Sequence, residues 1–137
     1  MIKLDNRTSL QIKESLLNTI ADTLTNKEIE LIITTNDEIQ EINRTHRGID
    51  KPTDVLSFPY ENMPILGSIV IAQEFVEAKA EELGHSQQDE YTLLFIHGLL
   101  HLLGFDHEVD SGEMREEEKK LIEQFSLPKS LIVRIEG

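Results

Sequence analysis

The segment HGLLHLLGFDH, residues 97–107, constrains the fold of this chain more than any other stretch of it. His97 and His101 are four residues apart in an apolar run, so a helix of about 3.6 residues per turn places both imidazoles on one face. Gly104 follows where glycine can adopt the left-handed conformation that ends a helix and turns the chain back. Such a turn returns His107 toward the same point. The sequence therefore predicts a helix that ends beside a cluster of three histidines.

Three converging imidazoles with one open position are typical of a catalytic zinc site. The spacing H-x-x-x-H-x-x-G-x-x-H is that of the metzincin peptidases. Gly98 stands where those peptidases carry a glutamate as general base, and glycine cannot accept a proton. It can instead let a substrate or a neighbouring strand approach closely. Two other interpretations stay open, namely a structural metal with a fourth protein ligand and three unrelated histidines that pack near a helix end.

The composition predicts one globular domain covering residues 1–137, because 39% of the residues are hydrophobic and 28% are charged. The absence of cysteine excludes disulfides, thiolate nucleophiles and cysteine-ligated metal sites. The first residues, MIKLDNRTSL, lack the apolar core of a signal peptide. No apolar run approaches the ~20 residues of a membrane helix. We therefore expect a cytoplasmic protein without a membrane partner.

Hydrophobic periodicity predicts the order of the elements. Strands are expected at residues 2–4, 29–34, 54–58 and 66–72, with a further short strand at 131–135. Helices are expected at residues 9–23, 36–43, 73–83, 87–103 and 113–125, the first two capped by Ser9 and Asn36. Helices that cluster at both ends of a small sheet favour an α+β fold, with one βαβ unit near the N-terminus.

The charge distribution contains one exception to an acidic average. Thirteen basic residues against 26 acidic ones give a net charge of −13, which repels nucleic acid at long range. The segment NRTHRGIDK, residues 43–51, concentrates Arg44, Arg47 and Lys51. We expect Arg44 to lie at a helix C-terminus, which favours cations. Arg47 is expected in the loop that follows, where a guanidinium can bind a phosphate group.

Other polar residues receive less specific predictions. Four glutamates are expected to form a solvated helix face: Glu113, Glu116, Glu117 and Glu118. His46 and His85 are expected at the surface because they lie outside the histidine cluster in sequence. Asp106 and Glu108 flank His107, and either could orient an imidazole or simply cap the turn.

Two blocks of the sequence resemble the YbeY family of metal-dependent endoribonucleases. Residues 97–107 are similar to the family signature H-G-x-L-H-L-x-G-Y-D-H, with Phe105 in place of the commoner tyrosine. Residues 43–59, NRTHRGIDKPTDVLSFP, are similar to the family's arginine loop followed by TDVLSF. The resemblance covers most of the chain. It implies a zincin-like α+β domain with a small mixed four-stranded sheet, about five helices and a metal site at the end of one helix.

The resemblance also implies a function and its residues. One Zn²⁺ per chain is expected on His97, His101 and His107, and activity is expected to depend on Arg47 and His97. The implied reaction is cleavage of single-stranded RNA, in ribosomal RNA 3′-end maturation and ribosome quality control. The implied partners are the ribosome, ribosomal proteins and a ribosome-associated GTPase, and no DNA is expected. Ser68 stands where the family usually has aspartate, which leaves any role as a base at this position open.

The sequence leaves parts of the mechanism and of the function open. The nucleophile is either water or the RNA 2′-hydroxyl. Two alternative functions are a non-catalytic zinc-containing ribosome-binding factor and a metzincin-like metallopeptidase. The peptidase alternative is favoured by the histidine spacing and opposed by Gly98.

Overall fold

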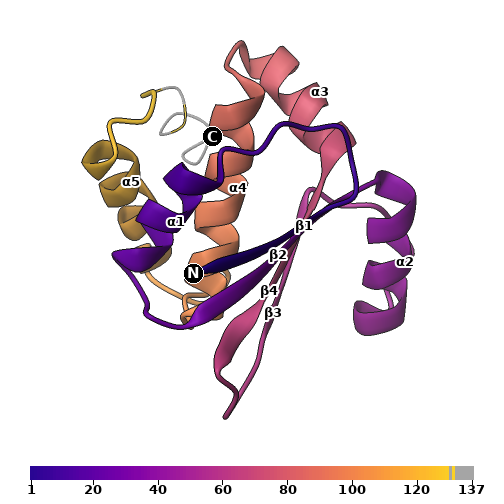
Figure 1. Ribbon diagram of the computed structural model, residues 1–137, viewed down its shortest axis with the longest axis horizontal. Coiled ribbons are helices and arrows are strands. Elements are labelled where there is room, and N and C mark those ends of the chain that lie inside the picture. Colours follow the sequence, from indigo (N-terminus) through magenta and orange to yellow (C-terminus); the bar gives the residue numbers. More distant parts are fainter. Residues whose placement is uncertain (130, 132–137) are drawn as a thin grey trace.

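The computed structural model describes residues 1–129 and 131, and Figure 1 shows helices packed on a small sheet. The strands are β1 (Ile2–Asn6), β2 (Glu28–Thr34), β3 (Val55–Pro59) and β4 (Ile65–Ala72). The helices are α1 (Glu14–Asp22), α2 (Asn36–Arg47), α3 (Gln73–Leu83), α4 (Gln87–Leu102) and α5 (Glu113–Gln124). Within residues 1–129, the predicted α+β class, four strands and five helices are confirmed. The strand predicted at 131–135 lies outside the described residues, apart from the buried Leu131.

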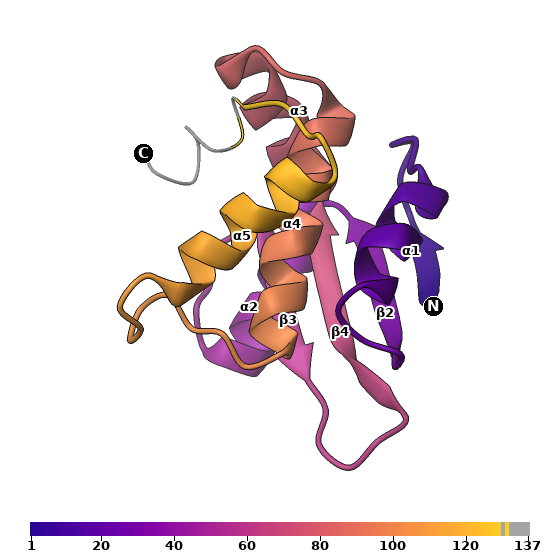
Figure 2. The same ribbon diagram turned by 90° about the vertical axis from the view of Figure 1, so that its left-hand side faces the viewer.

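The sheet is mixed, with the strand order β1-β2-β4-β3. Strands β1, β2 and β4 are parallel, whereas β3 runs antiparallel to β4 and forms an edge of the sheet. The parallel pairing of β1 and β2 across α1 confirms the βαβ unit that was predicted near the N-terminus. The short connection between β3 and β4 makes a hairpin, which extends away from the helices in Figures 1 and 2.

Helices cover both faces of the sheet, so the prediction that they cluster at its two ends is wrong. Helices α1, α4 and α5 lie on one side and α2 on the other (Figure 1). The reason is that β4 is apolar on both faces. Ile69 and Ile71 pack in the cluster that includes α1 and α4, whereas Val70 and Ala72 pack with Ile39 of α2. A strand buried on both faces needs a covering layer on each.

Helix α4 is largely buried and packs against β3 and β4. A Cβ added at Gly98 would lie 2.9 Å from Cγ2 of Ile69, so the glycine allows this helix and the strand to come together. Of the two approaches expected at Gly98, a substrate or a strand, the structure shows the strand. Despite its apolar character α4 is too short for a bilayer, and no helix among the described residues combines the length and apolarity needed to cross one.

Helix α1 begins at Glu14, so the prediction that Ser9 caps a helix from residue 9 is wrong. The preceding segment is held in a non-helical conformation by tertiary contacts. The Leu10 side chain is buried in the core beside the sheet. The backbone N–H of Lys13 donates to the hydroxyl of Tyr91 on α4, at 2.8 Å. Apolar spacing alone extends the helix too far because it does not register these contacts.

Helix α2 differs from its prediction at both ends. Thr35, not Asn36, is the N-cap, and its hydroxyl accepts from the backbone N–H of Glu38. The helix continues through Arg47 and ends at Gly48, whose φ of 70° is left-handed. Arg47 therefore lies in the last turn of the helix, and its predicted place in a loop is wrong. This glycine ends the helix because it adopts the left-handed conformation without a steric penalty.

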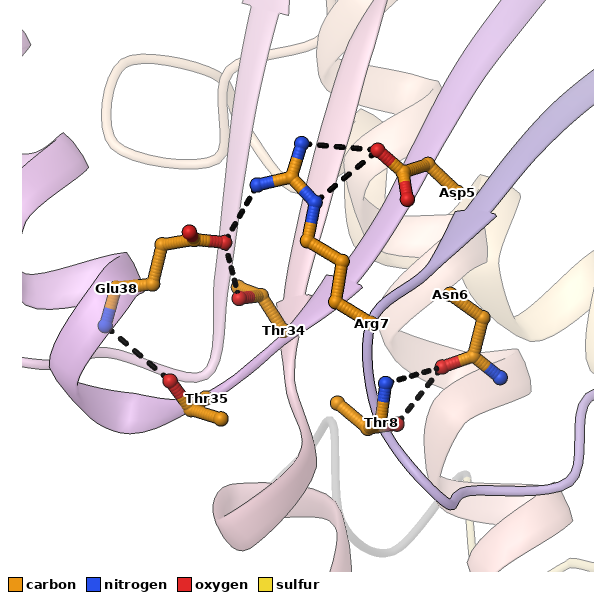
Figure 3. Close-up of polar contacts among 7 residues, drawn as sticks. All are labelled: Asp5, Asn6, Arg7, Thr8, Thr34, Thr35 and Glu38. Atoms are coloured by element: carbon orange, nitrogen blue, oxygen red, sulfur yellow. Dashed lines mark hydrogen bonds and ion pairs between the residues drawn. The ribbon is translucent and has the colours of Figure 1, made fainter.

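Arg7 fastens the end of β1 to the start of α2 (Figure 3). Its Nη2 and Nε donate to Asp5 at 2.9 and 3.1 Å, and its Nη1 donates to Oε1 of Glu38 at 2.6 Å. The hydroxyl of Thr34, at the end of β2, donates to the same Glu38 oxygen. The guanidinium thus joins β1 to α2, and the same Glu38 oxygen extends the contact to β2 through Thr34.

Candidate metal centre

Helix α4 ends in a reversal of the chain at Gly104, as the sequence predicted. Gly104 has a φ of 101°, and its backbone N–H donates to the carbonyl of His101 at 3.0 Å. The N–H of Phe105 donates to the carbonyl of Leu100 at 3.0 Å, which completes a Schellman motif. The chain therefore reverses directly after the helix and carries His107 back beside it.

The three histidines of this segment surround one point. The Nε2 atoms of His97 and His101 are 3.1 Å apart. The ring centroid of His107 is 5.3 Å from that of His97 and 5.4 Å from that of His101. One nitrogen from each ring lies within 4.8 Å of the other two. The structure thus brings together the three predicted ligands, with His107 exposed and the other two half-buried.

The Nδ1 atoms of the two helical histidines have acceptors of their own. Nδ1 of His101 lies 2.9 Å from the carbonyl oxygen of Phe105, and Nδ1 of His97 lies 3.2 Å from a carboxylate oxygen of Glu118. Burial, with the neighbouring His97 as a smaller cause, lowers the pKa of His101 below its ordinary value. A histidine with a lowered pKa is uncharged at neutral pH, which is the form that binds metals.

This donor set fits a metal ion. Zinc–nitrogen bonds of 2.0–2.1 Å place two nitrogens of a tetrahedral site about 3.3 Å apart. The 3.1 Å between the Nε2 atoms of His97 and His101 is close to that spacing. A carbonyl oxygen only accepts, so His101 donates through Nδ1 and its Nε2 carries a lone pair. The cluster could therefore hold a metal without rearrangement of the helix.

A cleft of about 520 Å³ opens on the histidines and on Arg47. It is lined by β3, by the last turn of α2 and by the turn after α4. Arg47 is exposed there, and Nη1 donates to Oδ1 of the buried Asn43 across 3.4 Å. Asn43 in turn donates to the carbonyl of Lys51 at 2.9 Å, which ties the following loop to the helix. The cleft thus brings together residues from the two sequence blocks 43–59 and 97–107.

A second cleft of about 230 Å³ lies against the same histidines. His97 and His107 line both clefts, as do Asp54 and Val55 at the start of β3. Helix α5 contributes the remaining charged groups of this second cleft, Arg115 and Glu118. The histidine cluster therefore stands where the two clefts meet.

Two residues that matter here were misjudged from the sequence. Glu118 is buried and contacts His97, so the prediction of a wholly solvated acidic face is wrong. His85 was expected at the surface, but its side chain is 4% exposed and pairs with the buried Glu90 at 2.8 Å. The burial of Glu118 could have been predicted from its helical spacing with Met114 and Leu121, which places all three residues on one inward face of α5.

Asp106 caps the turn instead of orienting a histidine. Its Oδ1 accepts from the backbone N–H of Glu108 at 3.0 Å, and both residues are exposed. Of the two roles considered for Asp106, the structure shows capping. Asp110, further along, accepts from the N–H groups of Gly112 and Met114 at the start of α5, and these bonds lower its pKa.

Ser68 lies on the face of the sheet opposite the histidines. Successive residues of a strand point to opposite faces, so Ser68 shares a face with Val70 and not with Ile69. It is buried, donates to Glu30 at 2.7 Å and contacts the hydroxyl of Tyr60 at 2.6 Å. The serine therefore joins β2, β4 and the hairpin, away from the candidate metal centre.

Comparison with known proteins agrees with this geometry. A family model described as Endoribonuclease YbeY matches residues 2–126. A protein named Endoribonuclease YbeY from Sulfurimonas denitrificans is 65% identical over 100% of both chains. One of the same name from Aliarcobacter butzleri is 62% identical over 98% of this chain and 99% of its own. The solution structure of a Thermotoga maritima protein, 32% identical, matches with a TM-score of 0.65 over 91% of this chain and 89% of that one. This chain therefore belongs to the YbeY family of endoribonucleases.

Proposed function

We propose that this protein is a metal-dependent endoribonuclease that hydrolyses single-stranded RNA, with residues 1–137 acting as one catalytic domain. The observation that carries the proposal is that Arg47 and all three histidines line one and the same cleft. A cationic side chain beside a cluster of imidazole nitrogens that can bind a metal matches the needs of a phosphodiester substrate. Membership of an endoribonuclease family supports RNA as that substrate.

The proposed cofactor is one Zn²⁺ held by His97, His101 and His107. Three imidazole nitrogens that lie close together support zinc, which is commonly bound in this way. When bound, the ion supplies Lewis-acid chemistry for cleavage of the phosphodiester. His97 lines both clefts, so it faces substrate on either side of the cluster. We propose it as a catalytic residue as well as a ligand.

Arg47 is the proposed contact for the phosphate group. The 3.4 Å bond to Asn43 is long, so the guanidinium keeps donors available for a phosphate oxygen. Charge that develops on the phosphoryl oxygens is stabilised by a cation already in place. This local positive group offsets the net charge of −13, which disfavours RNA over the rest of the surface.

The acidic surface also bears on the substrate. An acidic enzyme binds free RNA weakly, so we propose that its substrate is presented by a larger assembly in the cytoplasm. Family resemblance supports ribosomal RNA 3′ ends, in maturation and in ribosome quality control. It supports ribosomal proteins and a ribosome-associated GTPase as the partners that present them.

The metallopeptidase alternative lacks a general base at the position where the metzincin motif carries one. The position that would carry it is Gly98, which packs against Ile69 of β4. A glutamate side chain at this place would meet the core and not the cleft. The described structure therefore offers no support for peptide hydrolysis at this position.

The test is cleavage of a labelled single-stranded RNA by the zinc-loaded protein. We expect wild type to cleave and Arg47→Ala to lose a factor of about 10²–10³ in rate, because a cation is removed from the phosphate. Arg44→Ala is the matched control, since Arg44 lies on the same helix, pairs with Glu41 at 2.6 Å and does not line the cleft. Each variant is purified in the same way and checked for folding by circular dichroism.

The pattern of outcomes separates the possibilities. Equal cleavage by wild type and Arg47→Ala would contradict the role of Arg47 and point to a contaminating nuclease. An all-deoxy strand of the same sequence tests the nucleophile, because only RNA carries a 2′-hydroxyl. Cleavage of the deoxy strand would exclude a mechanism that depends on that hydroxyl.

A further inference from the structure

Glu118 carries a carboxylate that is buried away from water. Its side chain is 6% exposed, whereas Glu113 and Glu116 on the same helix are exposed. Removing a carboxylate from water costs several kcal/mol unless hydrogen bonds or charges compensate. The position of Glu118 on α5 therefore requires a partner in the protein.

That partner is His97. Oε1 of Glu118 lies 3.2 Å from Nδ1 of His97, on the side of the ring away from the histidine cluster. We assign the hydrogen of this contact to the Nδ1 of His97 and the acceptor role to the carboxylate, as in the carboxylate–histidine pairs that orient metal ligands. His97 then has the same tautomer as His101, whose Nδ1 donates to the carbonyl of Phe105. In both rings the lone pair is left on Nε2.

This shared tautomer has a consequence for the contact inside the cluster. The two Nε2 atoms are 3.1 Å apart, and in this tautomer neither of them holds a hydrogen to donate. Two lone pairs at that distance repel one another, and a cation between them removes the repulsion. The carboxylate of Glu118 and the carbonyl of Phe105, which accept from the two Nδ1 atoms, therefore favour an arrangement of the two rings that is most stable when a metal is bound.

We propose that Glu118 is a positioning residue of the metal centre, a role that rests on the metal site proposed above. Its carboxylate holds the ring of His97 in the tautomer and orientation that direct Nε2 to the metal. The negative charge also makes that imidazole a stronger ligand. Because Glu118 belongs to α5, the metal centre includes a third element besides α4 and the turn after it.

The pair His85–Glu90 provides an internal control. It is also a buried histidine–carboxylate contact, at 2.8 Å, with side chains 4% and 0% exposed. Neither residue belongs to the group of possible metal ligands found among the described residues. Replacing Glu90 therefore removes a buried carboxylate from a histidine without touching the metal centre.

The experiment measures zinc affinity by competition with a chromophoric chelator. We expect Glu118→Ala to bind zinc about 10–100-fold more weakly than wild type. Glu118→Gln keeps an oxygen that accepts from Nδ1 but loses the charge, so we expect a smaller, several-fold loss. Glu90→Gln is expected to bind zinc as wild type does. In the metal-free protein, ¹⁵N NMR of His97 is expected to show hydrogen on Nδ1 in wild type and a mixture of tautomers in Glu118→Ala.

The outcomes distinguish this proposal from the one on which it rests. A folded Glu118→Ala with wild-type zinc affinity and an unchanged His97 tautomer would overturn the role of Glu118. If Glu118→Ala does not fold, Glu118→Gln decides, and wild-type affinity in that variant is the contradicting result. Failure of the wild-type protein to bind zinc would instead overturn the metal site itself.

Discussion

Gly67 and Gly98 determine how closely α4 approaches the sheet. A Cβ at Gly67 on β4 would lie 2.5 Å from the carbonyl oxygen of Phe58 and 2.6 Å from Cδ2 of Leu102. A Cβ at Gly98 would lie 2.9 Å from a methyl carbon of Ile69. Both glycines are needed because a side chain would clash with the packed neighbours, and neither has the positive φ that favours glycine. The absence of side chains at these two positions therefore lets the end of α4, which carries His97 and His101, pack close to the sheet.

The two glycines should differ in their tolerance of alanine. For Gly67→Ala we expect a loss of about 3 kcal/mol in the free energy of unfolding, because the clash includes backbone that cannot move aside. For Gly98→Ala we expect a loss of about 1 kcal/mol, because gained helix propensity of about 1 kcal/mol offsets part of the overpacking against Ile69. Urea unfolding of the metal-free proteins measures both. Equal losses for the two variants would contradict this account.

Arg47 shows how a residue can be assigned a plausible role from the wrong local structure. The segment that contains it was predicted as a loop, yet Arg47 occupies the last turn of α2. A helical position fixes the direction of the side chain better than a loop does. The buried Asn43, one turn earlier, adds a contact with the guanidinium at 3.4 Å. The predicted chemistry of the residue does not depend on this error.

At the scale of elements, the joint between β1 and α2 depends on an exposed ion pair. The hydrogen bonds from Thr34 and from Arg7 lower the pKa of Glu38 below its ordinary value. A lowered carboxyl pKa stabilises the folded state above the pKa of the unfolded chain. That contribution is lost as the pH falls through the pKa of the folded state. The joint shown in Figure 3 should therefore weaken in acid.

Glu38→Gln tests this joint. We expect wild type to lose more stability than the variant between about pH 6 and about pH 3, because only wild type has this carboxylate to protonate. Both partners are more than 40% exposed, with side-chain values of 44% and 41%, so the difference should stay below about 1 kcal/mol. Urea unfolding at the two pH values measures it, with Glu41→Gln as the control because Glu41 forms an exposed ion pair with Arg44. The same acid loss in Glu38→Gln as in wild type would rule out this assignment.

At the scale of the whole molecule, a metal at the histidine cluster would join parts distant in sequence. Its ligands lie on α4 and on the turn that follows, and Glu118 connects them to α5. The cleft beside them also involves α2 and the edge strand β3. A metal that binds only the folded state adds its binding free energy to the stability of all these elements.

His101→Ala tests this linkage. Zinc at about 1,000 times its dissociation constant should stabilise wild type by about 4 kcal/mol, which raises Tm by on the order of 10 °C. We expect His101→Ala to show no such rise, because one of three ligands is gone. Thermal melts with zinc and with excess chelator measure the shift, and His46→Ala serves as a control because His46 is exposed and outside the cluster. A full zinc-dependent rise in His101→Ala would contradict the ligand assignment.

What the sequence determined by itself is local. The spacing of His97 and His101, the reversal at Gly104 and the bounds of α3 and nearly those of α4 follow from helix periodicity and from glycine. These features depend on residues within about one or two turns of each other. They required no knowledge of distant contacts, and the structure confirms them.

What only the tertiary structure decided is which distant groups meet. Arg47 comes to the histidines because α2 ends beside β3, and Glu118 because α5 folds back on α4. Ser68 is kept from them by the alternation of β4, which turns it to the other face of the sheet. Helix α1 starts late because of contacts with the core and with Tyr91. Each of these outcomes depends on pairings across many residues, and local periodicity carries no information about such pairings.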